Sequence, residues 1–478
     1  MSVLGHLEPK KVFTFFEEMC AIPHGSRNNT AISNWLVKFA VDRGLEHYQD
    51  EAENVIIIKP ATSGYETAGP VIIQGHMDMV CEKTADCAKD MACEGLDLAV
   101  DGDMIYAKDT TLGGDDGIAV AMGLAMLDSD DLAHPRLEVV ITTDEELSMD
   151  GAAALDASVL KGRRMLNIDS EVEGVFTVSC AGGAVCKVLL PVKREAFAGF
   201  VMTIAVDGLT GGHSGVEIHK GRGNADMLLG RVLYAAARKT PLRLISVEGG
   251  LKDNAIPAAA RAVVCVSDAE ALCSVWAEMD AALRAEYAVT DPDVRVVVTD
   301  GGVGTPMDEA STQHVICLLT CAPDGAQVMS ADIEGLVQTS LNLGVLYTQD
   351  EQVVASFCIR SSVDSQKRML IDRLACLARQ LGGESVVGGV YPGWAYRQDS
   401  PLRELMTQVY VEQYGSKPKI EAIHAGLECG LFAGKIPGLD CVSFGPDLLE
   451  IHTPRERMSI SSVQRIWQFL VELLRRMK

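Results

Sequence analysis

The chain has 478 residues, of which 48% are hydrophobic and 44 are glycine; it is too long for one ordinary domain and typical of a two-domain α/β protein. Its formal net charge of −24 disfavours nucleic acids and anionic membranes as partners, because their binders need a basic face. No apolar stretch reaches the roughly 18 residues of a membrane span, and no secretory signal opens the chain. The 14 cysteines are scattered without a CxxC motif. We therefore expect a soluble, cytoplasmic protein with reduced thiols.

The first part of the chain alternates between helix and strand patterns. Residues 10–19 and 30–43 have the helical spacing of apolar positions, and residues 54–59 and 71–75 have the composition of buried strands. Residues 117–127 are predicted to form a helix after a glycine turn. This alternation is typical of a doubly wound α/β sheet.

The pattern changes near residue 182, where strands become more polar and helices more charged, and it returns near residue 396. The returning elements are predicted helices at 400–414 and 459–478 and predicted strands at 419–423 and 441–444. We expect an α/β catalytic domain, residues 1–182 and 396–478, with a mixed, mostly parallel sheet flanked by helices. Residues 183–395 would form an inserted α+β lid domain.

The inserted segment contains a faint internal repeat. Residues 227–298 and residues 311–390 each show the order helix, strand, strand, helix, strand, although their sequences do not match. Two such halves placed side by side would make one long sheet backed by helices, which would suit a lid.

Side chains suited to metal binding follow several short apolar runs. Ligands of open α/β sheets gather beyond the carboxyl ends of the strands, so these side chains are expected to meet. Two divalent cations held close together need a bridging carboxylate, with imidazoles and further carboxylates outside. The pattern therefore predicts a two-metal hydrolase, and its residues are His76 with Asp78, Asp115, Glu145 with Glu146, Asp169 and His452.

Two of these motifs have a structural alternative. His76 and Asp78 are two residues apart, so in an extended chain the carboxylate would hold one ring N–H while the other ring nitrogen binds metal. A turn histidine capped by the aspartate is the alternative. In LGGDDG, Asp115 could instead cap the following helix, although the adjacent Asp116 leaves one acid free for another role.

TTDEELS places three acids in a row at a strand end, which costs repulsion unless cations or protons relieve it. We predict Glu146 as a metal ligand and Glu145 as the general base, its pKa raised toward neutrality by burial and repulsion. A solvated acidic loop is the alternative. Asp169 in NIDSE also suits a helix cap, and His452 beside Pro454 also suits a structural histidine.

His213 in GGHSGVEIHKGRGNA lies within the inserted segment. The flanking glycines would let it point at an oxyanion, and a surface-loop histidine is equally compatible with the pattern. The glycines of KGRGN lack the preceding strand of a dinucleotide-binding unit, so a phosphate loop is rejected.

Taken together, the motifs resemble one family nearly end to end. GHMDMV, TTLGGDDGIA, TTDEE, NIDSE, GGHSGVEIHKGRGNA, KDNAIP, SLNLG, HAGLECG and IHTPRERMSI closely resemble the aminoacyl-histidine dipeptidases, or peptidase D, a branch of the dinuclear zinc aminoacylase and carboxypeptidase superfamily. The resemblance implies two Zn²⁺ ions, with Co²⁺ or Mn²⁺ as alternatives. It implies this ligand set: His76 and Asp169 on one ion, Glu146 and His452 on the other, and Asp115 between them.

The resemblance also implies roles for further residues. Asp78 would orient His76, Glu145 would be the general base and His213 would stabilise the oxyanion. Substrate-binding residues would be Asn254, Arg360 and, near the substrate's terminal carboxylate, Gly426. One position departs from the family pattern: Asp109 stands where relatives tend to have glycine, and we expect its charge to alter metal choice or affinity.

The expected function is hydrolysis of unblocked dipeptides, with Xaa-His dipeptides among the substrates. An N-acyl amino acid deacylase or carboxypeptidase of the same superfamily is the alternative, as is a metal-binding protein that has lost catalysis. The expected partner is a small peptide. A homodimer is favoured because lids often pair in this superfamily, although a duplicated lid would supply His213 within one chain.

Overall fold

The computed structural model describes residues 2–478, and the chain divides into two compact units. The first unit contains the chain up to Ser179 together with Tyr396–Ala422 and Leu427–Lys478, and the second contains Cys180–Ala395 together with Ile423–Gly426. The second unit is thus an insertion in the first, to which one short later segment is added. Among residues 2–478, no helix combines the length and apolar character needed to cross a bilayer.

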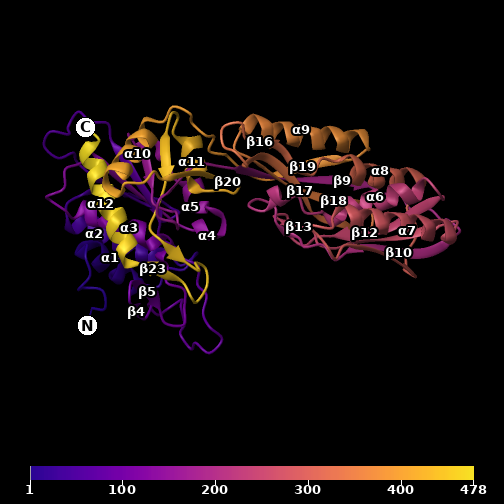
Figure 1. The fold of residues 1–478 in the computed structure, drawn as a ribbon, viewed down its shortest axis with the longest axis horizontal. Helices are drawn as coiled ribbons and strands as arrows, with labels where there is room; N and C mark the ends of the chain where they lie inside the picture. The colour runs from indigo at the N-terminus through magenta and orange to yellow at the C-terminus, as the bar shows by residue number, and fades with distance from the viewer. Residues whose placement is uncertain (1) are drawn as a thin grey trace. The chain divides into compact units, whose positions relative to one another are not determined.

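The first unit is built on an eight-stranded mixed sheet (Figure 1). Its four central strands run parallel to one another, and antiparallel strands extend it on both sides. In sheet order the strands are β1 (Glu46–Gln49), β2 (Val55–Lys59), β6 (Leu137–Thr142), β3 (Val71–His76), β7 (Arg164–Asn167), β21 (Asp440–Ser443), β8 (Val175–Cys180) and β20 (Lys419–Ile423). Every residue of β3 and β6 is buried, as expected for parallel strands covered on both faces.

Helices flank this sheet. Helix α3 packs against β3 and α1, α2 packs against β1 and β2, and α10 packs against α12 and β21. The helices of this unit are α1 (Lys10–Cys20), α2 (Thr30–Asp42), α3 (Gly114–Leu127), α4 (Glu145–Ser148), α5 (Asp150–Ala154), α10 (Pro401–Tyr414), α11 (Glu428–Lys435) and α12 (Ile460–Arg476). The fold class predicted from the sequence, a mixed α/β sheet flanked by helices, is confirmed.

A small four-stranded sheet was not predicted. It contains, in order, β22 (Leu448–Leu449), β23 (Arg457–Ser459), β5 (Met104–Ala107) and β4 (Leu98–Asp101). Two-residue and three-residue strands carry too little alternation to be recognised. The sheet ties the chain around His452 to the segment that precedes the LGGDDG motif.

An aromatic cluster holds the C-terminal helices on the main sheet. Phe176, Tyr410, Phe444 and Phe469 lie with neighbouring ring centroids 5.5–6.2 Å apart, mostly edge to face. Each such pair contributes about 0.5–1.5 kcal/mol beyond its buried area. Because Phe444 follows β21 directly, the cluster also fixes the start of the loop that carries His452.

The second unit is a nine-stranded antiparallel sheet with four helices. Along the sheet the strands are β15 (Arg295–Asp300), β10 (Phe200–Asp207), β14 (Ala260–Val266), β12 (Leu242–Gly249), β17 (Val337–Thr348), β18 (Gln352–Ser361), β9 (Gly182–Pro191) and β19 (Glu384–Tyr391), with β16 (Gly325–Met329) on β17. The helices are α6 (Ala225–Ala237), α7 (Ala269–Glu286), α8 (Glu309–Cys321) and α9 (Asp364–Gln380). A separate two-stranded ribbon pairs β11 (Gly212–His213) with β13 (Ala255–Ile256).

The strand order is symmetric about the β12–β17 pair. On one side β14, β10 and β15 follow, and on the other β18, β9 and β19 follow in the corresponding places. Each side also has two helices, in the order helix, two strands, helix, edge strand along the chain. The internal repeat itself stays a prediction.

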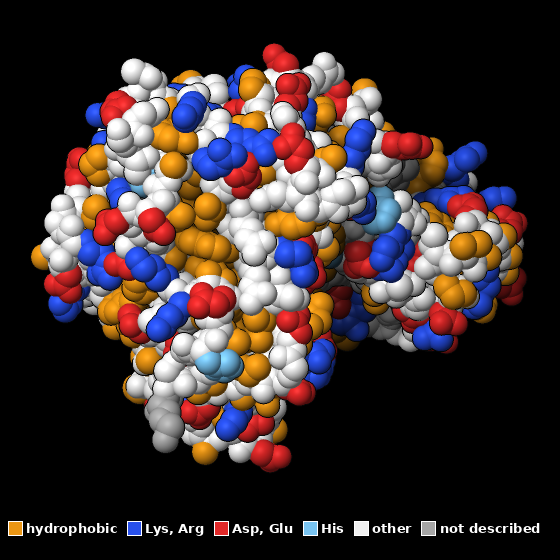
Figure 2. Space-filling view, turned by 60° about the vertical axis from the view of Figure 1, so that its left-hand side comes forward, with side chains coloured by type: hydrophobic (Ala, Val, Ile, Leu, Met, Phe, Trp, Pro, Cys, Tyr) orange, Lys and Arg blue, Asp and Glu red, His pale blue; other side chains and the backbone are white. Residues whose placement is uncertain are grey.

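Acidic and basic side chains are interspersed on the face drawn in Figure 2. The formal charge of −24 is therefore not gathered into one acidic area on that face. Some acids are buried instead, among them Asp78 and Asp144, which follow β3 and β6.

Candidate metal centre

Three neighbouring parallel strands deliver the first group of predicted site residues. His76 ends β3, Glu145 and Glu146 open α4 directly after β6, and Asp169 follows β7 by two residues. Strands β6, β3 and β7 are adjacent and parallel, so their carboxyl ends share one edge of the sheet. This is where an open α/β sheet places its ligands.

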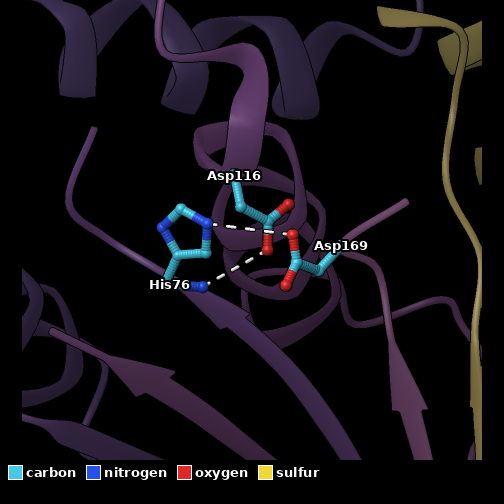
Figure 3. Close-up of side chains that lie close together, drawn as sticks. All are labelled: His76, Asp116 and Asp169. Carbon is cyan, nitrogen blue, oxygen red and sulfur yellow. Dashed lines mark hydrogen bonds and ion pairs between the residues drawn. The ribbon is translucent and has the colours of Figure 1, made fainter. Parts of the chain in front are cut away.

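Five predicted metal ligands lie within reach of one another. His76 Nε2 is 3.2 Å from Asp115 Oδ1 and 3.8 Å from Asp169 Oδ1 (Figure 3 shows the latter pair). His452 Nε2 is 3.2 Å from Asp115 Oδ2 and 2.9 Å from Glu146 Oε1. The two oxygens of Asp115 thus face two different imidazoles, as a carboxylate between two ions would have to do.

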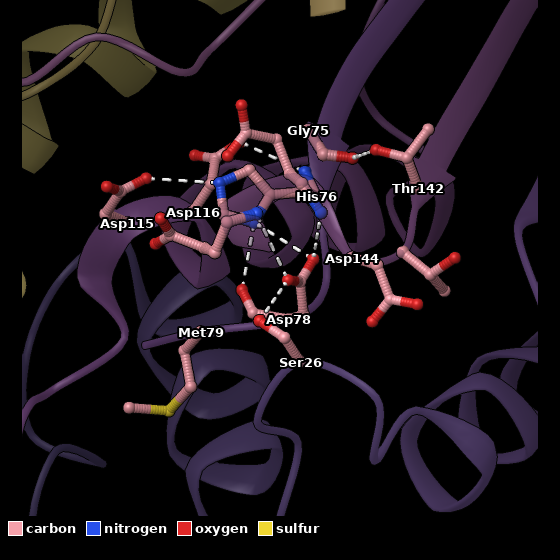
Figure 4. A network of polar contacts seen from close by, with 12 residues as sticks. Ser26, Gly75, His76, Asp78, Met79, Asp115, Asp116, Thr142 and Asp144 are labelled. Atoms are coloured by element: carbon pink, nitrogen blue, oxygen red, sulfur yellow. Dashed lines mark hydrogen bonds and ion pairs between the residues drawn. The ribbon is translucent and has the colours of Figure 1, made fainter. Parts of the chain in front are cut away.

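Asp78 contacts both His76 (Figure 4) and the first turn of α4. The Nδ1 atom of His76 lies 2.9 Å from the backbone oxygen of Asp78 and 3.5 Å from its Oδ1. The same carboxylate accepts hydrogen bonds from the backbone N–H groups of Glu145 and Glu146 and from Ser26 Oγ. Asp78 therefore holds the imidazole, chiefly through its carbonyl, and also fixes the first turn of α4.

This arrangement fixes the tautomer of His76. With Nδ1 donating to the carbonyl of Asp78, Nε2 is left with its lone pair directed toward Asp115 and Asp169. His76 is buried, with 1% of its surface exposed, whereas the side chain of His452 is 45% exposed. The two imidazoles therefore approach the acids from the interior and from the surface.

Asp116 belongs to the cluster although sequence reasoning left it as a helix cap. Its Oδ2 accepts the backbone N–H of His76 at 3.3 Å (Figure 3), and it groups with His76 and Asp169 as closely as Asp115 groups with His76 and Glu146. The N-cap of α3 is Gly113, without a side-chain hydrogen bond. A Cβ on Gly75 would lie 2.5 Å from Asp116 Oδ2, so only glycine admits this approach.

Glu456 supplies the cap that neither aspartate provides. Its carboxylate accepts the backbone N–H groups of Leu112, Gly113 and Gly114 at 2.8–3.2 Å. Gly113 and Gly114 are the N-cap and the first residue of α3, where backbone N–H groups have no partner within the helix. Because Glu456 follows His452 by four residues, it ties the loop of one imidazole to the loop of Asp115, a link that sequence reasoning missed.

The acidic run TTDEE is partly relieved by a cation that sequence reasoning did not identify. Arg27 pairs with Asp144, and Asp144 Oδ1 also accepts from Asn29 Nδ2. Asp144 is thereby directed away from the centre. No lysine or arginine among residues 2–478 forms an ion pair with Glu145 or Glu146, whose repulsion remains.

The pKa values show a centre with an excess of negative charge. Burial, followed by the charge of Asp116, raises the pKa of Asp169 well above its usual range. Burial and the neighbouring acids outweigh His76 and raise the pKa of Glu145 to about 7. The hydrogen bonds that His452 donates to Asp115 and Glu146 raise the pKa of His452 to about 10. The raised pKa values mean that these side chains hold protons at positions where bound cations would otherwise offset the negative charge.

The donor set fits divalent ions. Two imidazole nitrogens and several carboxylates are the ligands that Zn²⁺ accepts. The bonds to His452 and His76 overcome the effect of burial and lower the pKa of Asp115, which is therefore ionised between the two imidazoles. A carboxylate with both oxygens directed at ligand positions is what two neighbouring ions need.

The remaining predicted site residues lie in the second unit. His213 Nδ1 accepts N–H groups from Gly215 and Val216, both at 3.2 Å, so the ring proton is on Nε2. Burial, then the charge of Arg360, lowers the pKa of His213. Asn254 is exposed and Gly426 is half-buried, in the short segment Ile423–Gly426.

Arg360 is the charged residue of this second group. It is 7% exposed, contacts Tyr391 Oη at 3.4 Å through one terminal nitrogen, and its buried Nε has no hydrogen-bond partner. The nearby His424 is kept neutral: burial, then Arg360, lowers its pKa to about 3. Within residues 2–478 Arg360 forms no ion pair, so the guanidinium can accept an anion.

Asp109 has a conformational explanation. Its φ is +61°, in the left-handed region where glycine is favoured and where aspartate is among the better-tolerated alternatives. The residue is exposed, so water and salt screen its charge. The expectation that it alters metal binding has no support in this geometry.

Comparisons with known proteins identify the family and the fold. Residues 72–476 match the model of peptidase family M20/M25/M40. The chain is 37% identical over 480 residues to the cytosol non-specific dipeptidase of Escherichia coli (strain K12), covering 99% of each. The crystal structure of aminoacylhistidine dipeptidase from Vibrio alginolyticus superposes with a TM-score of 0.93 at 37% identity, over 98% of this chain and 97% of that one.

A more distant structure shares the fold alone. An aminopeptidase from Bacillus cereus ATCC 10987 matches with a TM-score of 0.56 at 16% identity, over 99% of this chain and 100% of that one. Both units therefore recur together in proteins whose sequences have diverged widely.

Proposed function

This chain belongs to peptidase family M20/M25/M40 and is a dipeptidase, and we propose that it hydrolyses unblocked dipeptides at a dinuclear zinc centre in the first unit. The observation that carries the proposal is Asp115, whose two oxygens face His76 and His452 within a cluster of further carboxylates. The first unit would be the catalytic domain and the second the lid domain.

The proposed ligands are those whose side chains converge. His76 and Asp169 would hold one ion, Glu146 and His452 the other, and Asp115 would bridge them. When bound, two divalent ions polarise the scissile carbonyl and lower the pKa of water. Asp116 lies close enough to compete for the first position, but its bond to the backbone of His76 gives it a supporting role.

Glu145 is the proposed general base. Its side chain is largely buried, and its backbone N–H at the start of α4 donates to Asp78. Within residues 2–478 it forms no ion pair with a lysine or arginine. Its carboxylate takes a proton from the attacking water as the water oxygen bonds to the carbonyl carbon. When the carbon–nitrogen bond breaks, Glu145 returns that proton to the leaving amine.

The second unit would recognise the substrate. His213, which carries its proton on Nε2, is proposed to donate a hydrogen bond to the oxyanion. Arg360 is proposed to bind the terminal carboxylate of the dipeptide, with Asn254 and Gly426 as further contacts. A carboxylate–guanidinium pair in a buried position would favour short peptides with a free C-terminus.

The proposed range of substrates is based on the names of two relatives. One is named a non-specific dipeptidase and the other an aminoacylhistidine dipeptidase, so Xaa-His dipeptides are proposed among several substrates. A cytoplasmic location is proposed because the first of these is named a cytosol enzyme. The homodimer stays a prediction.

The test is a metal analysis combined with a peptide panel. Purified protein is expected to carry two zinc ions per chain and to cleave free dipeptides, including Xaa-His, while chelator abolishes cleavage and zinc restores it. Faster hydrolysis of N-acetylated amino acids than of free dipeptides would favour the deacylase instead. Bound metal without hydrolysis of either class would indicate a metal-binding protein without catalysis.

A further inference from the structure

One fully buried acid lies behind the metal centre and has no part in the chemistry above. Glu428, the first residue of α11, has 0% of its surface exposed. Its Oε2 accepts hydrogen bonds from Gln74 Nε2 at 2.6 Å and from Thr142 Oγ1 at 2.7 Å. Its Oε1 is buried without a hydrogen-bond partner.

The hydrogen bonds of Glu428 continue across three strands. Gln74 on β3 accepts from Asn167 on β7 at 2.6 Å, and the two residues are directly opposite in the sheet. Thr142 ends β6, opposite His76. The side chains of Glu428, Thr142, Gln74 and Asn167 therefore form a continuous polar link across β6, β3 and β7.

Each strand residue of this link lies just before a residue of the centre. Gln74 precedes His76 by two residues, Asn167 precedes Asp169 by two, and Thr142 precedes Glu145 by three. Because side chains alternate along a strand, a residue two positions earlier points to the same face. For Gln74 and His76, both within β3, this places the link one layer of side chains beneath the metal ligand. Asn167 and Thr142 end β7 and β6, just before the segments that carry Asp169 and Glu145.

A helix-terminal role does not account for burying this carboxyl. A carboxylate in the first turn of a helix gains about 0.3–1 kcal/mol from the dipole, and an exposed glutamate gains the same. Burying a carboxyl costs several kcal/mol unless it is well bonded or neutral. Glu428 also forms no side-chain cap for α11. Its location therefore needs another explanation.

We propose that Glu428 is a positioning residue for dipeptide hydrolysis: it connects α11 to the ends of β3 and β6 and so fixes His76 relative to Glu145. This inference rests on the proposed function, because the spacing of these two side chains matters only if both act. A shift of about 1 Å between reacting groups costs on the order of 100-fold in rate, which is the scale of loss such a link would prevent.

The carboxyl is needed for its hydrogen bonds and not for its charge. Burial, then the charge of Glu145, raises the pKa of Glu428, so this position disfavours a negative charge. Gln74 and Thr142 both donate to one oxygen, and a glutamine in place of Glu428 keeps that acceptor. Glutamine is therefore the conservative replacement and alanine the disruptive one.

The experiment measures kcat and KM separately in zinc-loaded protein. Glu428→Gln is expected to keep kcat within about threefold of the wild type, whereas Glu428→Ala lowers kcat by about 10- to 100-fold and changes KM far less. Thr142→Val is expected to lower kcat by about tenfold. The double variant Glu428→Ala with Thr142→Val is expected to be no worse than Glu428→Ala alone, because both remove one link.

Glu138 offers a matched control. It is also a fully buried glutamate and lies at the opposite end of β6, where it accepts from the backbone of Lys161 and Gly162 and from Arg136. Glu138→Ala is expected to lower the melting temperature without lowering kcat of the folded protein. An equal fall in kcat in Glu138→Ala would overturn the proposal, because the effect would then be general loosening of the sheet.

Other results would also overturn it. Unchanged kcat in folded Glu428→Ala, or additive losses in the double variant, would show that no coupled link exists. Should Glu428→Ala not fold, full activity of Thr142→Val decides against the proposal and a tenfold loss decides for it. Parallel assays of the wild type and of Glu145→Gln keep the two ideas apart: if only the wild type is active, the proposed function holds whatever Glu428 does.

Discussion

The groups of candidate functional residues in the two units have opposite charge. The first gathers acids around His76 at the ends of parallel strands, and within residues 2–478 no lysine or arginine pairs with Glu145 or Glu146. The second buries Arg360 beside two histidines that are kept neutral. The acids of the first unit suit bound cations, and Arg360 of the second suits a bound anion.

The architectures explain the division. Parallel strands bring their carboxyl ends to one edge, so residues far apart in sequence converge there. The antiparallel sheet of the second unit offers no such edge, and its functional candidates lie in a ribbon loop, within β18 and in the segment Ile423–Gly426. Sequence motifs at strand ends were therefore easier to interpret than those of the second unit.

The largest expected effect concerns the acid group. Glu145→Gln should lower kcat by about 10²- to 10⁴-fold, because the amide cannot take the proton of water. Zinc content should be unchanged, since Glu145 is not a proposed ligand. Steady-state kinetics together with metal analysis checks both statements, and near-normal kcat would show that the base is misassigned.

A second substitution tests the basic group. Arg360→Ala should lower kcat/KM for free dipeptides by about 10- to 100-fold, the value of a buried charge-assisted bond. Dipeptide amides, which lack the carboxylate, should be poor substrates of the wild type and lose little more in the variant. Arg360→Lys serves as the control that keeps the charge. Equal losses on acids and amides would contradict the role given to Arg360.

The pH dependence sharpens the account of the acid group. Burial raises the pKa of Glu145 to about 7, and bound cations favour its ionised form, so the acid limb should lie at or below pH 7. Because the base must be ionised, kcat/KM should fall about tenfold per pH unit below that limb. The residual activity of Glu145→Gln should lack this limb, and its persistence there would assign the limb to another group.

A buried acid in the second unit tests whether acids are tolerated without a ligand. Asp226 has 0% of its surface exposed and neither carboxylate oxygen has a hydrogen-bond partner; burial, then Asp324, raises its pKa well above its usual range. When the pKa of a carboxyl is higher in the folded protein than in the unfolded chain, the folded protein loses stability as the pH rises from about 4 through the folded-state pKa.

Asp226→Asn should therefore be more stable than the wild type at pH 8, by about 1–3 kcal/mol, and gain little near pH 4. Thermal unfolding at several pH values measures this difference. A gain of the same size at every pH would mean that the carboxyl does not titrate between those values.

The smallest effect is expected at Asp109. Asp109→Gly should change zinc affinity and kcat by less than about twofold, because the side chain is exposed and its charge is screened. Isothermal titration and kinetics would detect a larger change, which would restore the expectation that this charge acts on the metal centre.

Much of the fold followed from periodicity. The helices predicted at residues 10–19 and 30–43 and the strands at 54–59 and 71–75 are confirmed as α1, α2, β2 and β3 within one or two residues at most ends. The convergence of His76 with Asp115 and His452 also followed from strand-end placement and from the family resemblance.

The supporting residues could not be predicted, because their partners are distant in sequence. Glu456 bonds to backbone N–H groups more than 340 residues away, and Glu428 bonds to Gln74 at a separation of 354 residues. Periodicity reports which face is buried but not which polar groups meet there. Asp116 was assigned to capping for the same reason, since a local role was the only one visible.

The link from Glu456 to residues 112–114 bears on how the enzyme is made. Both His452 and the Glu456 carboxylate that anchors the Asp115 loop lie more than 330 residues after that loop along the chain. A nascent polypeptide emerging from the ribosome therefore holds most of its metal ligands long before it can assemble them. Hydrolysis can begin only after both of these distant segments have been synthesised.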